Sequence, residues 1–156
     1  MNRNKSVVAA AARRQTKTAS QTLGFSMWLT PSRATTPAEQ ARFQRRLEDH
    51  LAEHDLLGSG APLQMLIWAD ERSLTTTDQV DLLVWAIGQP GVNAVELGPL
   101  VPHAGMPGER GSQPVVVARF SDLCLVPIIW LYQASRLKAE QVIELLGGFR
   151  STATLH

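Results

Sequence analysis

The segment His50-Leu51-Ala52-Glu53-His54 has the clearest potential for chemistry in this sequence. Two histidines four residues apart share one face of a helix, and imidazole nitrogens are common zinc ligands. The order H-x-x-E-H also occurs in one class of zinc peptidases, with the glutamate as general base. Catalytic zinc usually takes a third protein ligand, however. Such peptidase domains are also usually larger than a chain of 156 residues.

The position of the two imidazoles on their helix favours a structural role. At the helical spacing of 100° per residue, Leu47, His50 and His54 all fall within about 40° of Phe43 on the helical wheel. We therefore expect both rings to border the core, and we predict no metal and no cofactor. Zinc held by His50 and His54 is the alternative.

The other reactive residue types predict no catalytic site. Gly58-Ser59-Gly60 lacks the Lys-Ser or Lys-Thr and the following helix of a phosphate-binding loop, so we interpret it as a helix stop. Asp70 and Glu71 lie on an expected loop, where paired carboxylates are most often solvated. Cys124 stands in an apolar run and is expected to be buried and inert. These patterns predict a binding protein and no enzyme.

The basic residues are concentrated at the N-terminus. Residues 1–18 hold five of the 15 basic side chains and no acidic one, a charge of +5, so the remaining residues carry 10 basic and 14 acidic side chains, a charge of −4. A basic arm on a mildly acidic body suits contact with the phosphates of a polyanion, although a merely solubilising terminus has the same pattern. The predicted nucleic-acid-binding residues are Arg3, Lys5, Arg13, Arg14 and Lys17.

The composition fits one folded domain with an appendage. Hydrophobic residues make up 44% of the chain and charged residues 19%, which is enough apolar material for a core. No apolar run approaches the roughly 18 residues of a membrane span. The Ala-rich stretch near the N-terminus is followed by arginines, where a signal peptide would have its cleavage site. We expect a cytoplasmic protein with no membrane partner.

Periodicity and capping patterns predict alternating strands and helices. Thr36, Pro37 and Glu39 form a helix start with a capping box, and Thr76 and Gln79 stand in the same register before a second helix. The expected elements are a strand at Leu23–Thr30, a helix from Thr36 to about Leu56, a strand at Leu63–Ala69, a helix from Thr76 to Gly88, a strand at Val92–Val101 interrupted near Pro99, a strand at Pro114–Phe120, and a helix at Ile128–Leu146.

This order predicts an α+β fold. We expect an open-faced sandwich with a ferredoxin-like β-α-β-α-β sheet, helices on one face, and an added C-terminal strand and helix. An extra short strand between Leu63 and Leu74 would complete the ferredoxin-like pattern. The expected divisions are a basic flexible arm (1–22), an α+β domain (23–101), a linker or long loop (102–113) and a C-terminal extension (114–149).

Two of the four tryptophans are candidates for partner binding. Trp28 alternates with the apolar face of its strand, and Trp68 lies on the next expected strand, so both could stack on RNA bases from the outer sheet surface. Burial beneath the C-terminal helix is the alternative, and we favour it. Trp85 and Trp130 lie in apolar helical runs and are expected in the core.

Several short motifs occur in a fixed order over residues 1 to about 101. They are a basic start containing Asn-Arg, Leu23-Gly24-Phe25-Ser26, the helix start Thr36–Gln40, Leu57-Gly58-Ser59-Gly60, Thr75–Gln79 and Val95-Glu96-Leu97-Gly98-Pro99-Leu100-Val101. In this order and spacing the chain resembles the YggL-like family of large-ribosomal-subunit-binding proteins. The resemblance implies a small α+β protein that associates with the large subunit through a basic N-terminus, without catalytic residues or cofactor. The Ala-rich stretch Ala9–Ala12 and residues 102–156 depart from the family pattern.

We therefore predict a non-enzymatic ribosome-associated protein whose basic arm contacts large-subunit rRNA. The alternative is a protein-interaction, regulatory or assembly module that acts through the C-terminal helix, with a homodimer as one form. That helix has more apolar positions than a lone surface helix needs, namely Leu131, Leu137, Val142, Ile143 and Leu146.

Overall fold

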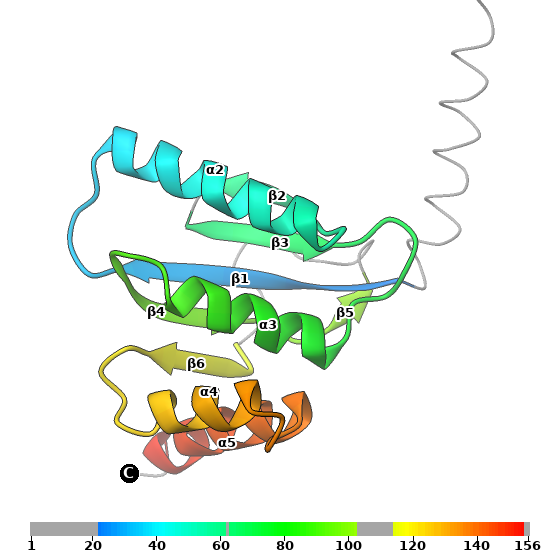
Figure 1. Ribbon diagram of the computed structural model, residues 1–156, viewed down its shortest axis with the longest axis vertical. Helices are drawn as coiled ribbons and strands as arrows, with labels where there is room; N and C mark the ends of the chain where they lie inside the picture. The colour runs from blue at the N-terminus through cyan, green and yellow to red at the C-terminus, as the bar shows by residue number, and fades with distance from the viewer. Residues whose placement is uncertain (1–21, 62, 103–113, 155–156) are drawn as a thin grey trace, which may run out of the picture.

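The computed structural model describes residues 22–61, 63–102 and 114–154, with side chains as far as residue 147. These residues form a mixed α+β fold with an open antiparallel sheet (Figure 1). The elements are β1 (Leu23–Pro31), α2 (Pro37–Glu53), β2 (Leu57–Ala61), β3 (Gln64–Trp68), α3 (Thr76–Ile87), β4 (Val92–Leu97), β5 (Val101–Pro102), β6 (Val116–Arg119), α4 (Leu125–Gln133) and α5 (Ala139–Thr154).

The sheet has the strand order β2-β3-β1-β4-β6, and the short β5 also pairs with β1. Every pairing is antiparallel. In the register of the central strand, Met27 lies between Met65 of β3 and Leu97 of β4. The C-terminal strand β6 pairs with β4, so it extends the same sheet.

The extra strand lies before Leu63, and our placement of it after that residue is wrong. We interpreted Gly58-Ser59-Gly60 as a helix stop, but these residues belong to β2. A Cβ atom at Gly58 would lie 2.6 Å from Cε of Met65 and 2.8 Å from Cδ1 of Leu51. A larger residue at Gly58 would therefore have to displace the ends of the Met65 and Leu51 side chains.

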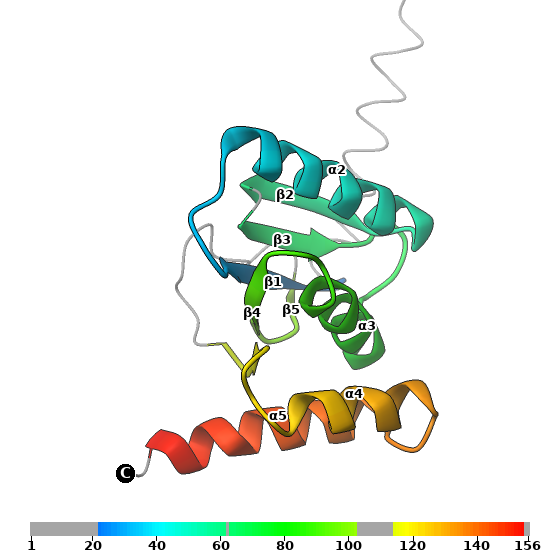
Figure 2. The same ribbon diagram turned by 60° about the vertical axis from the view of Figure 1, so that its left-hand side comes forward.

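The helices lie on one face of the sheet, with α2 and α3 across it and α4 and α5 beyond its β6 end (Figures 1 and 2). Alternation along β1 turns Phe25, Met27 and Leu29 into the core beneath the helices. From α2 the core receives Phe43 and Leu47. The hydrophobic core thus lies between the sheet and the helices α2 and α3.

Both predicted capping boxes exist, but the second begins one residue earlier than predicted. Thr36 and Glu39 cap α2 as expected. The box of α3 joins Thr75 to Asp78, whose carboxylate accepts from the Thr75 amide at 2.7 Å. A carboxylate is a stronger acceptor than the Gln79 amide, which explains the shifted start. Gln79 instead turns inward and donates to the carbonyl of Gly98 at 2.9 Å.

The predicted single helix at Ile128–Leu146 is wrong, because the chain forms two helices there. The break follows α4, where Ser135 adopts a φ of 59°. Pro127 stands in the first turn of α4, where backbone N–H groups have no intrahelical acceptor, so the helix includes it. Residues Gly147-Gly148 do not end α5, which continues to Thr154.

Candidate functional site

The helix α4 carries the most exposed large apolar side chains among the described residues. Leu123, just before its first residue, is 94% exposed, Val126 is 61% exposed and Trp130 is 76% exposed. Val126 and Trp130, four residues apart, share one face of α4, and Leu123 lies in the turn before the N-cap residue Cys124. We call these three residues the apolar face of α4.

This face was missed in the sequence, where Trp130 and Cys124 are predicted to be buried. Both predictions are wrong, because Trp130 points outward and Cys124 is exposed. The opposite side of α4 fills the core with Leu125 and Ile128. When a helix is apolar on all sides but packs against the core on one side only, its other apolar side is exposed to solvent. The available signal was the absence of charged residues at positions 123–135.

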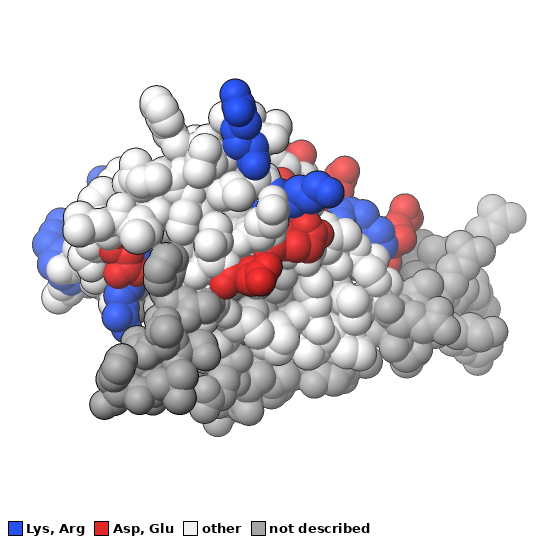
Figure 3. All heavy atoms as spheres, turned by 90° about the horizontal axis from the view of Figure 1, so that it is seen from below, with Lys and Arg blue, Asp and Glu red and all other residues white. Residues whose placement is uncertain are grey.

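The helix α4 is fixed to the body by its other side. The hydroxyl of Tyr132 donates a hydrogen bond to the carboxylate of Asp81 on α3. Burial raises the pKa of Tyr132 above its ordinary value, and the hydrogen bond and charge of Asp81 raise it further. Figure 3 views this end of the molecule, where charged side chains run across the face between uncharged areas. The apolar face is thus presented on an anchored helix.

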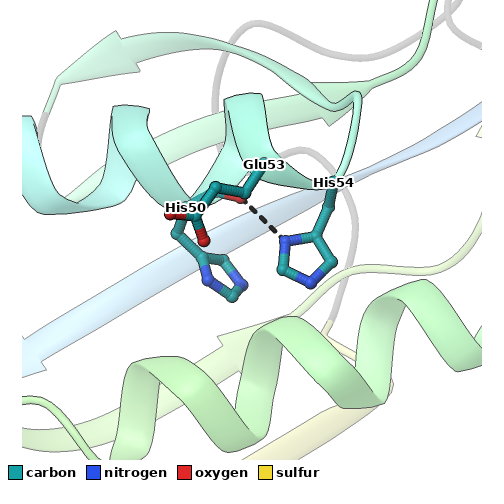
Figure 4. Close-up of side chains that lie close together, drawn as sticks. All are labelled: His50, Glu53 and His54. Carbon is teal, nitrogen blue, oxygen red and sulfur yellow. Dashed lines mark hydrogen bonds between the residues drawn. The ribbon is translucent and has the colours of Figure 1, made fainter.

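A second cluster lies at the C-terminal end of α2. One ligand atom each from His50, Glu53 and His54 lies within 4.8 Å of the other two. Both rings project from α2 toward α3, with their centroids 4.4 Å apart (Figure 4). His50 stacks on the Trp85 ring of α3 at a centroid distance of 4.5 Å and an interplanar angle of 17°. The three residues form an arrangement that can hold a metal ion.

The prediction that both imidazoles face the core is wrong for His54. Only His50 is half-buried, whereas His54 is exposed. The helix ends at Glu53, so the 100° spacing does not extend to His54, which caps it with φ −108° and ψ 14°. Burial lowers the pKa of His50 below its ordinary value, and the neighbouring His54 lowers it further. Neutral imidazole is therefore favoured at His50.

A third feature is a pocket of about 530 Å³ beside the N-terminal half of α2. Its apolar lining includes Leu29 and Phe43, and its basic lining is formed by Arg33, Arg42 and Arg46. The guanidinium carbon of Arg46 lies 5.8 Å from the centre of the Phe43 ring. Such a volume and mixed lining are typical of small-ligand pockets. Three arginines make it suited to an anionic group.

Of the predicted binding residues, Trp28 and Trp68 belong to the part of the chain that the structure describes. Arg3, Lys5, Arg13, Arg14 and Lys17 lie outside the described residues, as does most of the expected linker 102–113. Trp28 is 5% exposed and Trp68 is half-buried. Trp28 is therefore buried, the alternative that we favoured over stacking on RNA bases. Trp85, expected in the core, is half-buried against His50.

The chain matches no known family model, no curated protein and no solved structure. Across the described residues, no helix has both the length and the apolar character needed to cross a membrane.

Proposed function

We propose that this protein is a non-enzymatic interaction module that pairs with a second copy of itself through the apolar face of α4. The observation that carries the proposal is the exposure of Leu123, Val126 and Trp130, at 94%, 61% and 76%. Exposed tryptophan and leucine on an anchored helix are typical of contact surfaces, where aromatic anchors contribute most of the binding energy.

A second copy suits this surface because the surface carries no charge. Between Asp122 and Arg136 the sequence has no acidic or basic residue. Two such faces meet around a twofold axis without like-charge repulsion and without leaving an ion unpaired. A stable dimer buries about 800 Å² per partner, of which one tryptophan contributes on the order of 150–250 Å².

The test measures the oligomeric state of the full chain and of a charged variant. We expect the wild-type protein to show a concentration-dependent dimer in sedimentation equilibrium and Val126→Lys to be monomeric, because two lysines would face each other across the axis. Leu57→Lys is the matched control, since Leu57 is 38% exposed on β2 at the far edge of the sheet. A wild-type monomer at every concentration, or equal dimerisation of Val126→Lys, would contradict the proposal.

A second candidate function is binding to large-subunit rRNA, as the resemblance to the YggL-like family implies. The structural observation in its favour is the pocket lined by Arg33, Arg42 and Arg46. Glu39 forms a salt bridge to Arg33 at 2.7 Å, so three arginines face a single carboxylate there. We infer that the basic arm would supply phosphate contacts and this pocket an ordered basic site on the body.

Co-sedimentation with large ribosomal subunits at several salt concentrations tests this second function. We expect deletion of residues 1–18 to abolish salt-sensitive binding, and Arg42→Gln to reduce the slope of log affinity against log salt by about 1. Arg136→Gln, an exposed arginine outside the pocket, is the control. Equal binding of the full and truncated chains at every salt concentration would refute the role of the arm.

We further infer that the described sheet is ferredoxin-like. The elements β1 to β4 follow the order β-α-β-β-α-β, with sheet order β2-β3-β1-β4. In a ferredoxin-like sheet, β6, α4 and α5 are an addition at the β4 edge. This addition carries the proposed dimer surface.

A further inference from the structure

We propose that His50, Glu53 and His54 form a binding site for one divalent transition-metal ion of the zinc and copper type. Their ligand atoms converge within 4.8 Å at the last turn of α2. Two imidazoles and one carboxylate are ligands that Zn²⁺ and Cu²⁺ accept readily, whereas Mg²⁺ prefers an all-oxygen site. The site goes beyond the proposed dimerisation and does not depend on it.

The hydrogen bonding of His54 prepares it as a ligand. Its Nδ1 lies 2.9 Å from the carbonyl oxygen of His50. A carbonyl oxygen can only accept, so Nδ1 carries the proton and, in the neutral ring, Nε2 carries the lone pair. Metal-bound histidines usually donate their other ring N–H to a carbonyl or carboxylate in this way. This hydrogen bond leaves Nε2 of His54 able to bind a metal.

The second imidazole is held in place by a ring contact. His50 lies against the Trp85 ring, with 4.5 Å between centroids and an interplanar angle of 17°, which restricts rotation of its side chain. This contact reduces the entropy lost when the ion binds.

The surroundings of the cluster favour a cation. The last carbonyls of α2 place the negative end of the helix dipole there. The carboxylate of Asp81, across the gap on α3, acts electrostatically on His50. Glu53 and His54 are exposed, so the ion has an entry path and coordination positions open to solvent.

Zinc binding to the full-length protein, purified without a histidine tag and stripped with a chelator, tests the site. We expect one Zn²⁺ per chain by isothermal titration calorimetry, with no binding of Mg²⁺. Removal of an outer-shell partner of a metal ligand weakens binding by about 10–100-fold. His54→Gln and Glu53→Gln each remove a ligand itself, so they should weaken binding at least as much. The double variant His103→Gln/His156→Gln keeps the cluster and should bind like wild type.

A second measurement guards against loss of the fold in the ligand variants. Cu²⁺ bound at the cluster should quench the fluorescence of Trp85, and Trp85→Phe should lose that part of the quenching. The near-ultraviolet circular dichroism of His54→Gln should match wild type, because its side chain is exposed. Retention of wild-type zinc affinity by both His54→Gln and Glu53→Gln would refute the site, as would the absence of stoichiometric zinc on the wild-type protein.

Discussion

Replacing Trp130 by alanine should separate dimer formation from folding. Trp130 is 76% exposed. With roughly 150–250 Å² for a fully buried tryptophan, this leaves about 110–190 Å² available to a partner. At about 25 cal/mol per Å² that area corresponds to an upper limit of about 3–5 kcal/mol of association free energy. The quarter of the Trp130 side chain that is buried in the monomer contributes about 1 kcal/mol to folding at the same value per Å².

Ile128 provides the opposite case on the same helix. It is 6% exposed and belongs to the hydrophobic core. Ile128→Ala should therefore lower the unfolding free energy of the monomer by about 2–5 kcal/mol, through lost burial and the cavity left behind. It should change the apolar face only indirectly. We therefore expect Trp130→Ala to weaken mainly the dimer and Ile128→Ala to destabilise mainly the folded monomer.

The assay combines urea unfolding with sedimentation equilibrium over a range of protein concentrations. We expect Trp130→Ala to weaken the dimer by about 30-fold, the effect of a 2 kcal/mol anchor residue. Its urea midpoint should lose the concentration dependence that a dimer shows. If Trp130→Ala lowers monomer stability as much as Ile128→Ala, then Trp130 stabilises the monomer and is no anchor of a dimer.

Three further outcomes follow from the contacts of α3 and α4. Burial alone would raise the pKa of Asp78, but hydrogen bonds from Arg72 and from the helix cap outweigh it and hold that pKa below its usual value. The stabilisation is therefore present above about pH 4 and lost as pH falls, so acid titrations of unfolding should be shallower for Asp78→Asn. Tyr132→Phe should lower the melting temperature by about 2–4 °C, the effect of about 1 kcal/mol in a chain of this size. Gln79→Leu, which leaves the Gly98 carbonyl without this donor, should lower the unfolding free energy in urea by about 1–3 kcal/mol, whereas an unchanged value would show that the bond contributes nothing.

The main elements could be predicted because local patterns determine them. Alternation in Leu23–Thr30 and the capping box at Thr36 each involve residues close in sequence, and both predictions are confirmed. The strand β2 was missed because Gly58 and Gly60 have the composition of a turn. Gly58 lies close to the side chains of Met65 and Leu51, and Gly60 to the backbone of Gln64, which only the folded chain reveals.

The candidate sites could be predicted less well because exposure depends on tertiary packing. Periodicity places Trp28 opposite the apolar face of its strand, but it does not tell whether that surface is covered. Trp130 lies in an apolar run, and no local pattern reports that only one side of α4 meets the body. For His54, the sequence did not show that α2 ends at Glu53 and leaves this residue at the exposed C-cap.

One carboxylate of α3 is linked to the dimer helix by a hydrogen bond and to the metal cluster by its charge alone. Asp81 accepts the hydrogen bond from Tyr132 of α4 and also acts on His50 of the metal cluster. The Asp81 carboxylate would attract a cation at the cluster. Loss of the Tyr132 hydroxyl would remove a hydrogen bond to this carboxylate, so its negative charge would attract the cation more strongly. Coupling between dimer formation and metal binding would therefore run through Asp81. Its sign follows from charge: Tyr132→Phe should favour the metal while loosening the anchor of the dimer helix.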